Sequence, residues 1–326
     1  MVLKLQSVIF SFIYFPVIFG APGEIANQKC IEYSQIPSQL SPYGCPRSPV
    51  PLIIGGTPTS LMEFPHMAAI GFGYTADGEI TWQCGGSLIS EKFVLSAAHC
   101  LKSRDKGPAQ KVRFGDNADS YDYINNEISS YREYYIINRI QHPDYKPPLK
   151  YNDIALLELH KPVQFSMDIR PACLETNNYN IPQTVIATGY GKQTYEFLGK
   201  YQLMKVELPV LSSDHCTRSF AVSMEEDMDH VSDIRRPRSV LKDGIIDSQM
   251  CVGDLSGHKD TCQGDSGGPI QVPLQWSPCT YKVIGVTSFG KFCGYPNAPS
   301  IYTRVSSYID WIEQVVWGNQ FKYQFK

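Results

Sequence analysis

Residues 260–269, Asp-Thr-Cys-Gln-Gly-Asp-Ser-Gly-Gly-Pro, carry the strongest chemical signal in the chain, because glycines flank Ser266. Glycine adopts backbone conformations that other residues avoid, so this stretch can turn sharply around the serine. Such a turn exposes the hydroxyl and brings backbone N–H groups near it, where they can stabilise the oxyanion of an acyl intermediate. The stretch also fits G-x-S-x-G, the nucleophile elbow of α/β-hydrolases, and it fits a glycine-rich turn with an incidental serine. A base and an acid elsewhere in the chain are needed to decide between these interpretations.

A histidine and an aspartate stand in contexts that suit a general base and its orienting acid. His99 ends the expected strand Leu-Ser-Ala-Ala-His-Cys, and the cysteine after it can hold it in place through a disulfide. Asp153 opens the apolar run Ile-Ala-Leu-Leu, where an ionised carboxylate is costly unless it has a partner. The chain order is histidine, aspartate, serine, whereas an α/β-hydrolase runs serine, acid, histidine. The order therefore excludes the elbow interpretation.

Short apolar runs between turn residues are expected to supply the scaffold, and they predict an all-β sandwich or barrel. The expected strands are 67–74, 82–89, 93–98, 111–114, 135–141, 154–160, 184–190, 201–211, 281–289 and 300–305. Ser212 or Ser213 is a candidate cap for a short helix. An amphipathic helix is expected to close the chain, because apolar residues recur at helical spacing at Val305, Tyr308, Ile309, Ile312 and Val316.

Length and composition indicate a globular protein from an oxidising compartment. The chain has 326 residues, 43% of them hydrophobic, and its net charge of −3 is too small to indicate a nucleic-acid partner. Residues 1–21 are expected to be a secretory signal peptide, since the apolar run is short and interrupted by Pro16. Ten cysteines then predict a secreted, disulfide-bonded protein without a membrane anchor. Residues 22–52 are expected to form an irregular arm, and residues 53–326 the folded domain.

Two polar stretches are expected to be surface loops. Residues 225–242 cluster acids and then arginines, which is typical of a solvated loop, with a docking surface as the alternative. The other loop carries four acidic residues, Asp116, Asp119, Asp122 and Glu127. Their spacing matches no strict calcium-ligand pattern, so neither a metal nor another cofactor is expected.

Five motifs in order resemble the chymotrypsin-like (trypsin-fold) serine endopeptidases. They are Ile-Ile-Gly-Gly from residue 53, Cys-Gly-Gly-Ser-Leu from 84, Ala-Ala-His-Cys from 97, Asp-Ile-Ala-Leu from 153 and Gly-Asp-Ser-Gly-Gly-Pro from 264. The resemblance covers residues 53 to about 317. It implies two six-stranded antiparallel β-barrels with a C-terminal helix.

The resemblance also implies the catalytic roles. Ser266 is the expected nucleophile, His99 the general base and then acid, and Asp153 the residue that orients the imidazole. The backbone N–H groups of Gly264 and Ser266 are the expected oxyanion hole.

Specificity is implied by residues around the primary substrate pocket. Asp260 is expected at the base of the pocket, where a carboxylate selects Arg or Lys in the substrate. Ser288 and Gly290 match the strand that pairs with the substrate backbone. Ser300 departs from the family pattern, which has glycine on this pocket wall, so it is expected to narrow the pocket, favour one basic residue or lower turnover.

The resemblance further implies a zymogen that is cleaved before Ile53, whose new α-ammonium pairs with Asp265. The residue before that bond is Leu52, so an enzyme that selects basic residues should not cut there. We therefore expect an upstream activating protease that accepts leucine, and no self-activation.

The implied disulfides are Cys84–Cys100, Cys216–Cys251 and Cys262–Cys293. Cys30, Cys45, Cys173 and Cys279 remain, and these four allow three pairings. Cys173 matches the position that tethers a propeptide in the family, so Cys30 or Cys45 is its expected partner. The arm has too few cysteines for the six-cysteine clip domain of arthropod cascade proteases, so none is expected.

The sequence and the resemblance therefore predict the secreted zymogen of a serine endopeptidase. The expected enzyme acts within a proteolytic cascade. The alternative is a non-catalytic homologue that acts as a binding or scaffold protein. Expected partners are protein substrates and the activating protease, with serpin-type inhibitors as further candidates. A monomer is expected.

Overall fold

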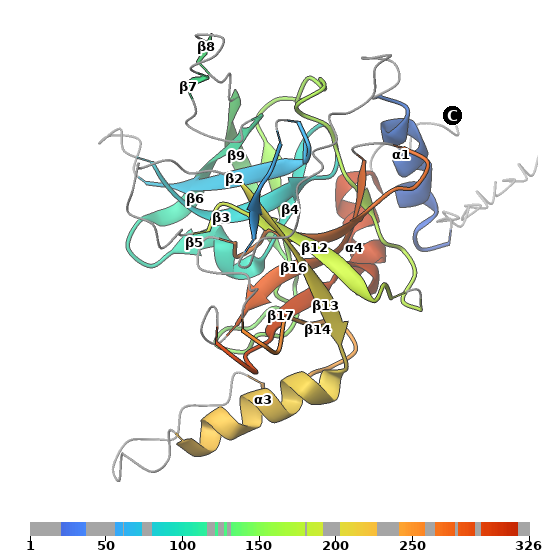
Figure 1. The fold of residues 1–326 in the computed structure, drawn as a ribbon. Helices are drawn as coiled ribbons and strands as arrows, with labels where there is room; N and C mark the ends of the chain where they lie inside the picture. The colour runs from blue at the N-terminus through green and yellow to red at the C-terminus, as the bar shows by residue number, and fades with distance from the viewer. Residues whose placement is uncertain are drawn as a thin grey trace, which may run out of the picture.

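Two β-barrels make up most of the structure, which is a computed structural model (Figure 1). It describes residues 21–36, 56–60, 62–73, 80–115, 121–122, 127–128, 132–179, 181–191, 203–226, 241–257, 265–277, 280–290 and 295–318. Each barrel is a closed ring of six antiparallel strands, and a helix ends the described chain. The predicted fold class is therefore confirmed.

The first barrel runs in the order β2-β3-β4-β10-β9-β6 and closes because β2 also pairs with β6. Its strands are β2 (Met67–Phe72), β3 (Thr81–Leu88), β4 (Phe93–Ser96), β6 (Gly107–Phe114), β9 (Arg132–Gln141) and β10 (Ala155–Leu159). Closure leaves no strand of the ring with an unpaired edge. The short strand β5 (Lys102–Ser103) pairs antiparallel with β6, and β7 (Tyr121–Asp122) pairs antiparallel with β8 (Glu127–Ile128).

The second barrel runs in the order β13-β12-β15-β16-β17-β14 and closes through a β13–β14 pairing. Its strands are β12 (Thr184–Gly189), β13 (Met204–Leu211), β14 (Gln249–Val252), β15 (Pro269–Pro273), β16 (Tyr281–Phe289) and β17 (Ser300–Arg304). Two short strands join it from outside: β1 (Thr57–Pro58) pairs with β13, and β11 (Cys173–Leu174) lies parallel to β16.

The C-terminal helix packs its apolar face into the core of the first barrel. A 3-10 turn (Val305–Tyr308) leads into α4 (Ile309–Val316). All of the residues predicted for the apolar face are buried, namely Val305, Tyr308, Ile309, Ile312 and Val316. They belong to the same hydrophobic cluster as Leu88 and Leu156, so the predicted amphipathic helix is confirmed.

The N-terminal arm differs from the prediction of an irregular segment, because it contains the helix α1 (Glu24–Ser34). Its buried residues Ala26, Cys30, Tyr33 and Ser34 lie on one helical face. A disulfide joins Cys30 to Cys173, with an S–S distance of 2.06 Å. The composition of the arm did not predict this helix, because tertiary packing rather than intrinsic helix propensity stabilises so short a helix. Cys45 and Cys279 lie outside the described residues.

The ten predicted strands begin or end within a few residues of observed ones. Of the barrel strands, β14 and β15 were not predicted, and neither were the two-residue strands β1, β5, β7, β8 and β11. The strands β14 and β15 are both short, and β15 directly follows the glycine-rich stretch, so neither has a clear apolar alternation. The helix α3 (Ser213–Glu226) begins where a serine cap was predicted and is longer than expected. Its first turn is held to β14 by the Cys216–Cys251 disulfide, and Figure 1 shows its far end projecting from the second barrel.

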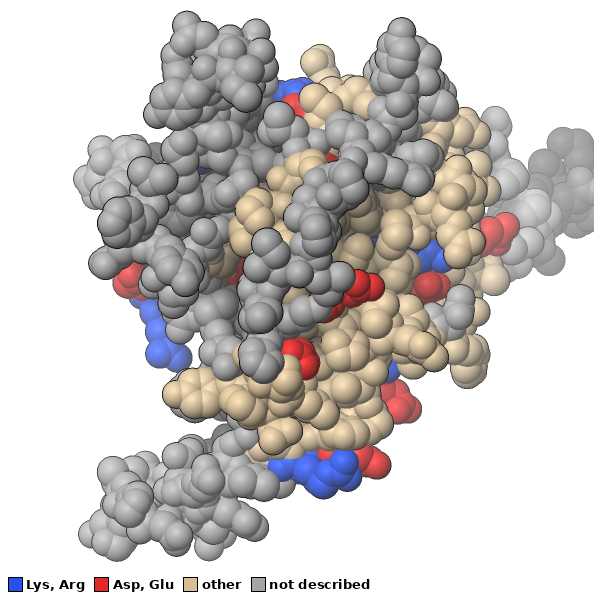
Figure 2. Space-filling view, viewed as in Figure 1, with Lys and Arg blue, Asp and Glu red and all other residues tan. Residues whose placement is uncertain are grey.

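Charged side chains do not form one dominant patch on the described surface that Figure 2 shows. Acidic and basic residues are scattered there among uncharged ones. Among the described residues, none of the helices combines the length and apolar character needed to cross a bilayer.

Candidate active site

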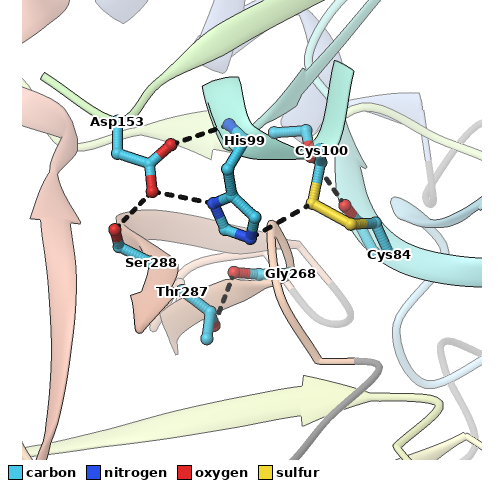
Figure 3. Close-up of a disulfide and its surroundings, with 9 residues drawn as sticks. Cys84, His99, Cys100, Asp153, Gly268, Thr287 and Ser288 are labelled. Carbon is cyan, nitrogen blue, oxygen red and sulfur yellow. Dashed lines mark hydrogen bonds and ion pairs between the residues drawn. A yellow bond between two sulfur atoms is a disulfide. The ribbon is translucent and has the colours of Figure 1, made fainter. Parts of the chain in front are cut away.

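His99 and Asp153 meet at the end of the first barrel. His99 lies in a 3-10 turn (Ala98–Leu101) that follows β4, and Asp153 lies just before β10, the strand that pairs with β4. His99 Nδ1 is 2.8 Å from Asp153 Oδ2, and the backbone N–H of His99 donates to Asp153 Oδ1 at 2.9 Å (Figure 3). Two contacts to one carboxylate fix both the position of the residue and the orientation of its ring.

The side chain of Asp153 has no solvent exposure, yet its surroundings favour the ionised carboxylate. Burial alone would raise its pKa, but the nearby His99 imidazole and hydrogen bonds from His99 and Ser288 outweigh burial and hold the pKa below its usual value. The side chain of His99 is 23% exposed, so its ring faces the outside while its partner is enclosed. This arrangement suits an imidazole that exchanges protons with a bound molecule.

Ser288 links the second barrel to this pair. It lies in β16, and its hydroxyl donates to Asp153 Oδ2 at 2.5 Å (Figure 3). In β17, Thr303 Oγ1 donates to the backbone carbonyl of Asp153 at 2.9 Å. The sequence placed Ser288 in a substrate-pairing strand but gave no signal that its side chain contacts Asp153. The family motif around Ser288 concerns backbone hydrogen bonds to the substrate, not the serine side chain. The contact with Asp153 also joins residues that are 135 positions apart in the sequence.

Ser266 lies on the turn that precedes β15, at the junction of the two barrels. The backbone N–H of Gly85 in β3 donates to the carbonyl of Ser266 at 2.8 Å. The next residue, Gly267, has a φ of 78°, which glycine adopts readily. A Cβ there would lie 2.2 Å from Ser96 Oγ and 2.6 Å from Gly85 O. The glycines around the serine therefore allow the two barrels to approach closely.

Two adjacent residues of β3, Cys84 and Gly85, make contacts that position the segments carrying His99 and Ser266. Cys84 is bonded to Cys100, which follows His99, with an S–S distance of 1.99 Å. Cys100 Sγ is 3.7 Å from His99 Nε2. These sulfur atoms and the imidazole lie within 4.8 Å of one another, but a disulfide cannot offer the thiolates that bind a metal ion. Among the described residues, no hydrogen bond joins His99 to Ser266.

Asp265 points toward the loop that follows β12. Its Oδ1 accepts the backbone N–H of Gly191 at 2.9 Å. A Cβ on Gly189 would lie 1.9 Å from the same oxygen, so only glycine leaves room for this carboxylate.

Gly290 directly follows β16 and lies against Ser300, the first residue of β17. Ser300 is 3% exposed, and a Cβ on Gly290 would lie 2.6 Å from its Oγ and 3.5 Å from its Cβ. The structure therefore places the hydroxymethyl group that departs from the family pattern directly against the glycine predicted to line the pocket mouth.

Six predicted site residues lie outside the described part of the chain. They are Leu52, Ile53, Asp260, Cys262, Gly264 and Cys293.

Comparison with known proteins points to one family. The family model described as Trypsin matches residues 53–312. The chain is 42% identical over 306 residues to serine protease snk of Drosophila melanogaster, covering 89% of this chain and 65% of that protein. It is 37% identical to serine protease Hayan of the same organism, covering 82% of this chain and 40% of that protein. It is 31% identical to the proclotting enzyme of Tachypleus tridentatus, covering 86% of this chain and 70% of that protein.

The chain thus spans 65% or less of the lengths of the two Drosophila relatives. The family model nevertheless covers both barrels, including His99, Asp153 and Ser266. The match over residues 53–312 and the two closed six-stranded barrels agree, and the chain belongs to the trypsin family of serine proteases.

Proposed function

We propose that this protein is a serine endopeptidase that cleaves peptide bonds after Arg or Lys. The observation that carries the proposal is the 2.8 Å contact between His99 Nδ1 and the buried Asp153 carboxylate. It supports an imidazole whose Nδ1 carries a proton and whose Nε2 is left to act as a base.

In the acylation step, Ser266 Oγ attacks the carbonyl carbon of the scissile bond while His99 Nε2 takes the hydroxyl proton. The charged imidazole is stabilised by Asp153 and then delivers that proton to the departing amine as the C–N bond breaks. An ester between Ser266 and the acyl half of the substrate remains. Water repeats the sequence on this ester, and the carboxylic acid leaves as Ser266 recovers its proton. The backbone N–H groups of Gly264 and Ser266 would hold the oxyanion in both halves.

Substrate selection is proposed to lie with Asp260, Gly290 and Ser300. A carboxylate at the base of a desolvated pocket gains most from a guanidinium that binds it through two parallel hydrogen bonds. The close approach of Ser300 to Gly290 supports a pocket that is narrower than one walled by two glycines.

Activation is proposed to follow cleavage between Leu52 and Ile53 by another protease that accepts leucine. The new α-ammonium would then pair with Asp265, whose carboxylate is already held at Gly191. The relative named proclotting enzyme supports a place in an extracellular proteolytic cascade. Secretion through residues 1–21, regulation by serpin-type inhibitors and a monomeric state complete the proposal.

Peptide turnover tests the proposal. The protein is cut at Leu52–Ile53 and offered matched peptides that end in Arg, Lys, Leu or Glu before a chromogenic leaving group. We expect turnover of the Arg and Lys peptides only, and its loss in Ser266→Ala. A cut protein that folds but turns over none of them would instead support a non-catalytic scaffold.

A further inference from the structure

The arm helix α1 depends on a side chain from the opposite end of the chain. Its N-cap residue, Gly23, has no side chain with which to cap the helix, and its φ is 92°. Glu313 of α4 supplies the missing acceptor: its Oε2 accepts the Gly23 N–H at 3.0 Å and its Oε1 accepts the Ala26 N–H at 2.7 Å. The first N–H groups of a helix have no partner within the helix, so this carboxylate satisfies two of them and also complements the helix dipole.

Burial makes this contact important to both partners. Glu313 is only 5% exposed, so its carboxylate has lost most of its hydration. An ionised carboxylate in such a place is costly unless hydrogen bonds replace the lost water. Removal of α1 would take both donors away from this carboxylate. The docking of the arm and the hydrogen bonding of Glu313 therefore depend on each other.

Further contacts hold the rest of α1 without the disulfide. At its start, Asn27 Nδ2 is 3.2 Å from Thr176 Oγ1, and at its end Ser277 Oγ donates to the carbonyl of Ser34 at 2.7 Å. Between them, Tyr33 is 4% exposed and meets Phe165 edge to face, with ring centroids 5.9 Å apart. The contacts thus extend over the whole length of the helix and combine apolar burial with hydrogen bonds.

We propose that residues 23–34 form a docked subunit that stays bound through Glu313 after the chain is cut between α1 and the barrels, even when the Cys30–Cys173 bond is absent. The arm is then a permanent structural part of the protein rather than a segment that the disulfide alone retains. This inference does not rest on catalysis, and its test needs no activity.

The test uses the full chain with Ser266→Ala, to prevent self-digestion, and a site-specific protease sequence inserted after Gln39. Cutting there separates α1 from Cys45, so no bond formed by Cys45 can retain the fragment. Cys30→Ser and Cys173→Ser then remove the known tether. After cutting, gel filtration without reductant and mass spectrometry measure the fraction of the arm fragment that travels with the barrels.

We expect the fragment to co-elute with the barrels in this background. Glu313→Gln should weaken its binding at least about tenfold, since hydrogen bonds to a charged group are the strong ones. Asp310→Asn is the matched control, because it removes an exposed carboxylate from the same helix, and the hydrogen-bond partner of that carboxylate is Gln314 of that helix. A fragment that elutes alone in the parent background would overturn the proposal, as would equal retention in Glu313→Gln and Asp310→Asn.

Hydrogen exchange gives a second readout if the cysteine variants do not fold. In the intact, disulfide-bonded chain, the amides of Gly23 and Ala26 should be protected. Glu313→Gln should speed their exchange at least about tenfold, while Asp310→Asn leaves it unchanged. Fast exchange of both amides in the unaltered chain would contradict the docking role of Glu313.

Discussion

The backbone N–H of Gly85 donates to the carbonyl of Ser266 at 2.8 Å, so the candidate nucleophile of the second barrel is anchored on a strand of the first. The residue before Gly85 is Cys84, whose disulfide to Cys100 holds the turn that carries His99. Two consecutive positions of β3 thus fix both reacting groups. Any change that pushes the barrels apart at β3 should therefore disturb the site without touching a reacting atom.

Gly267 is where such a change can be made. We expect Gly267→Ala to lower the free energy of unfolding, because its Cβ would lie 2.2 Å from Ser96 Oγ and its φ is 78°. Gly244→Ala is the control, since Gly244 has a φ of 70° but nothing within 4 Å of an added Cβ. Urea unfolding should show Gly267→Ala to be less stable than the control by about 1–3 kcal/mol, the cost of overpacking. Equal stability of the two variants would mean that the two barrels do not approach each other closely at Gly267.

Ser288 should stabilise the protein in a manner that depends on pH. Its hydroxyl bonds the ionised form of Asp153, and the pKa of that carboxyl is lowered in the folded protein. The stability that this carboxylate contributes is present above the pKa of an unfolded aspartate, about 4, and is lost as pH falls through the lower folded value. Ser288→Ala should therefore cost about 1.5–3 kcal/mol at pH 7 and less in strong acid.

Thr303→Val serves as the control for Ser288→Ala. The Thr303 hydroxyl donates to the backbone carbonyl of Asp153, which does not titrate. Urea unfolding measured between pH 7 and pH 2 should show a cost for Thr303→Val that stays constant. A constant cost for Ser288→Ala as well would show that its hydroxyl does not favour the charged carboxylate.

His66 should make the protein sensitive to acid. It is buried beside Gln271, Arg170 and Tyr281, and burial lowers its pKa from 6.5 to about 3. Between these values the unfolded chain binds a proton at this position and the folded chain does not, so stability falls as pH falls. His66→Phe should reduce the slope of unfolding free energy against pH by up to about 1.4 kcal/mol per pH unit near pH 5.

His160→Gln is the matched control, because its imidazole is exposed. Urea unfolding at several pH values between 4 and 6 compares the two variants directly. Identical slopes in both would mean that His66 takes up a proton in the folded protein.

Ser300 should limit the passage of the bulkier basic side chain into the pocket. Ser300→Gly removes the group that lies against Gly290, so we expect kcat/KM for Arg peptides to rise about tenfold relative to Lys peptides. Ser300→Ala keeps the Cβ and removes only the hydroxyl. Comparison of the two variants therefore separates the effect of side-chain size from that of hydrogen bonding by the hydroxyl. Steady-state kinetics on the cut protein supplies both ratios. An unchanged Arg-to-Lys ratio in Ser300→Gly would remove Ser300 from the specificity argument.

Local patterns were sufficient to predict an all-β fold and the closing helix, because β2 and β10 are short apolar runs and α4 has helical apolar spacing. The division into two six-stranded barrels was predicted from the family resemblance instead. The helix α1 could not be predicted from local patterns. Its N-terminus is capped by Glu313, 290 positions away from Gly23 in the sequence, and the N-cap position has no Ser, Thr, Asp or Asn side chain. The hydroxyl of Ser288 was missed for the same reason, since its contact with Asp153 exists only once two barrels have closed.

The most direct measurement of the central claim is covalent labelling of Ser266 by a fluorophosphonate after cleavage at Leu52–Ile53. Only a serine that a neighbouring base has activated attacks the phosphorus of the label and displaces its fluoride. We predict one label per chain, located at Ser266 by peptide mass spectrometry, and slow labelling when His99 is replaced by alanine. A cut, folded protein that takes no label at Ser266, or labels as fast without His99, would contradict the account.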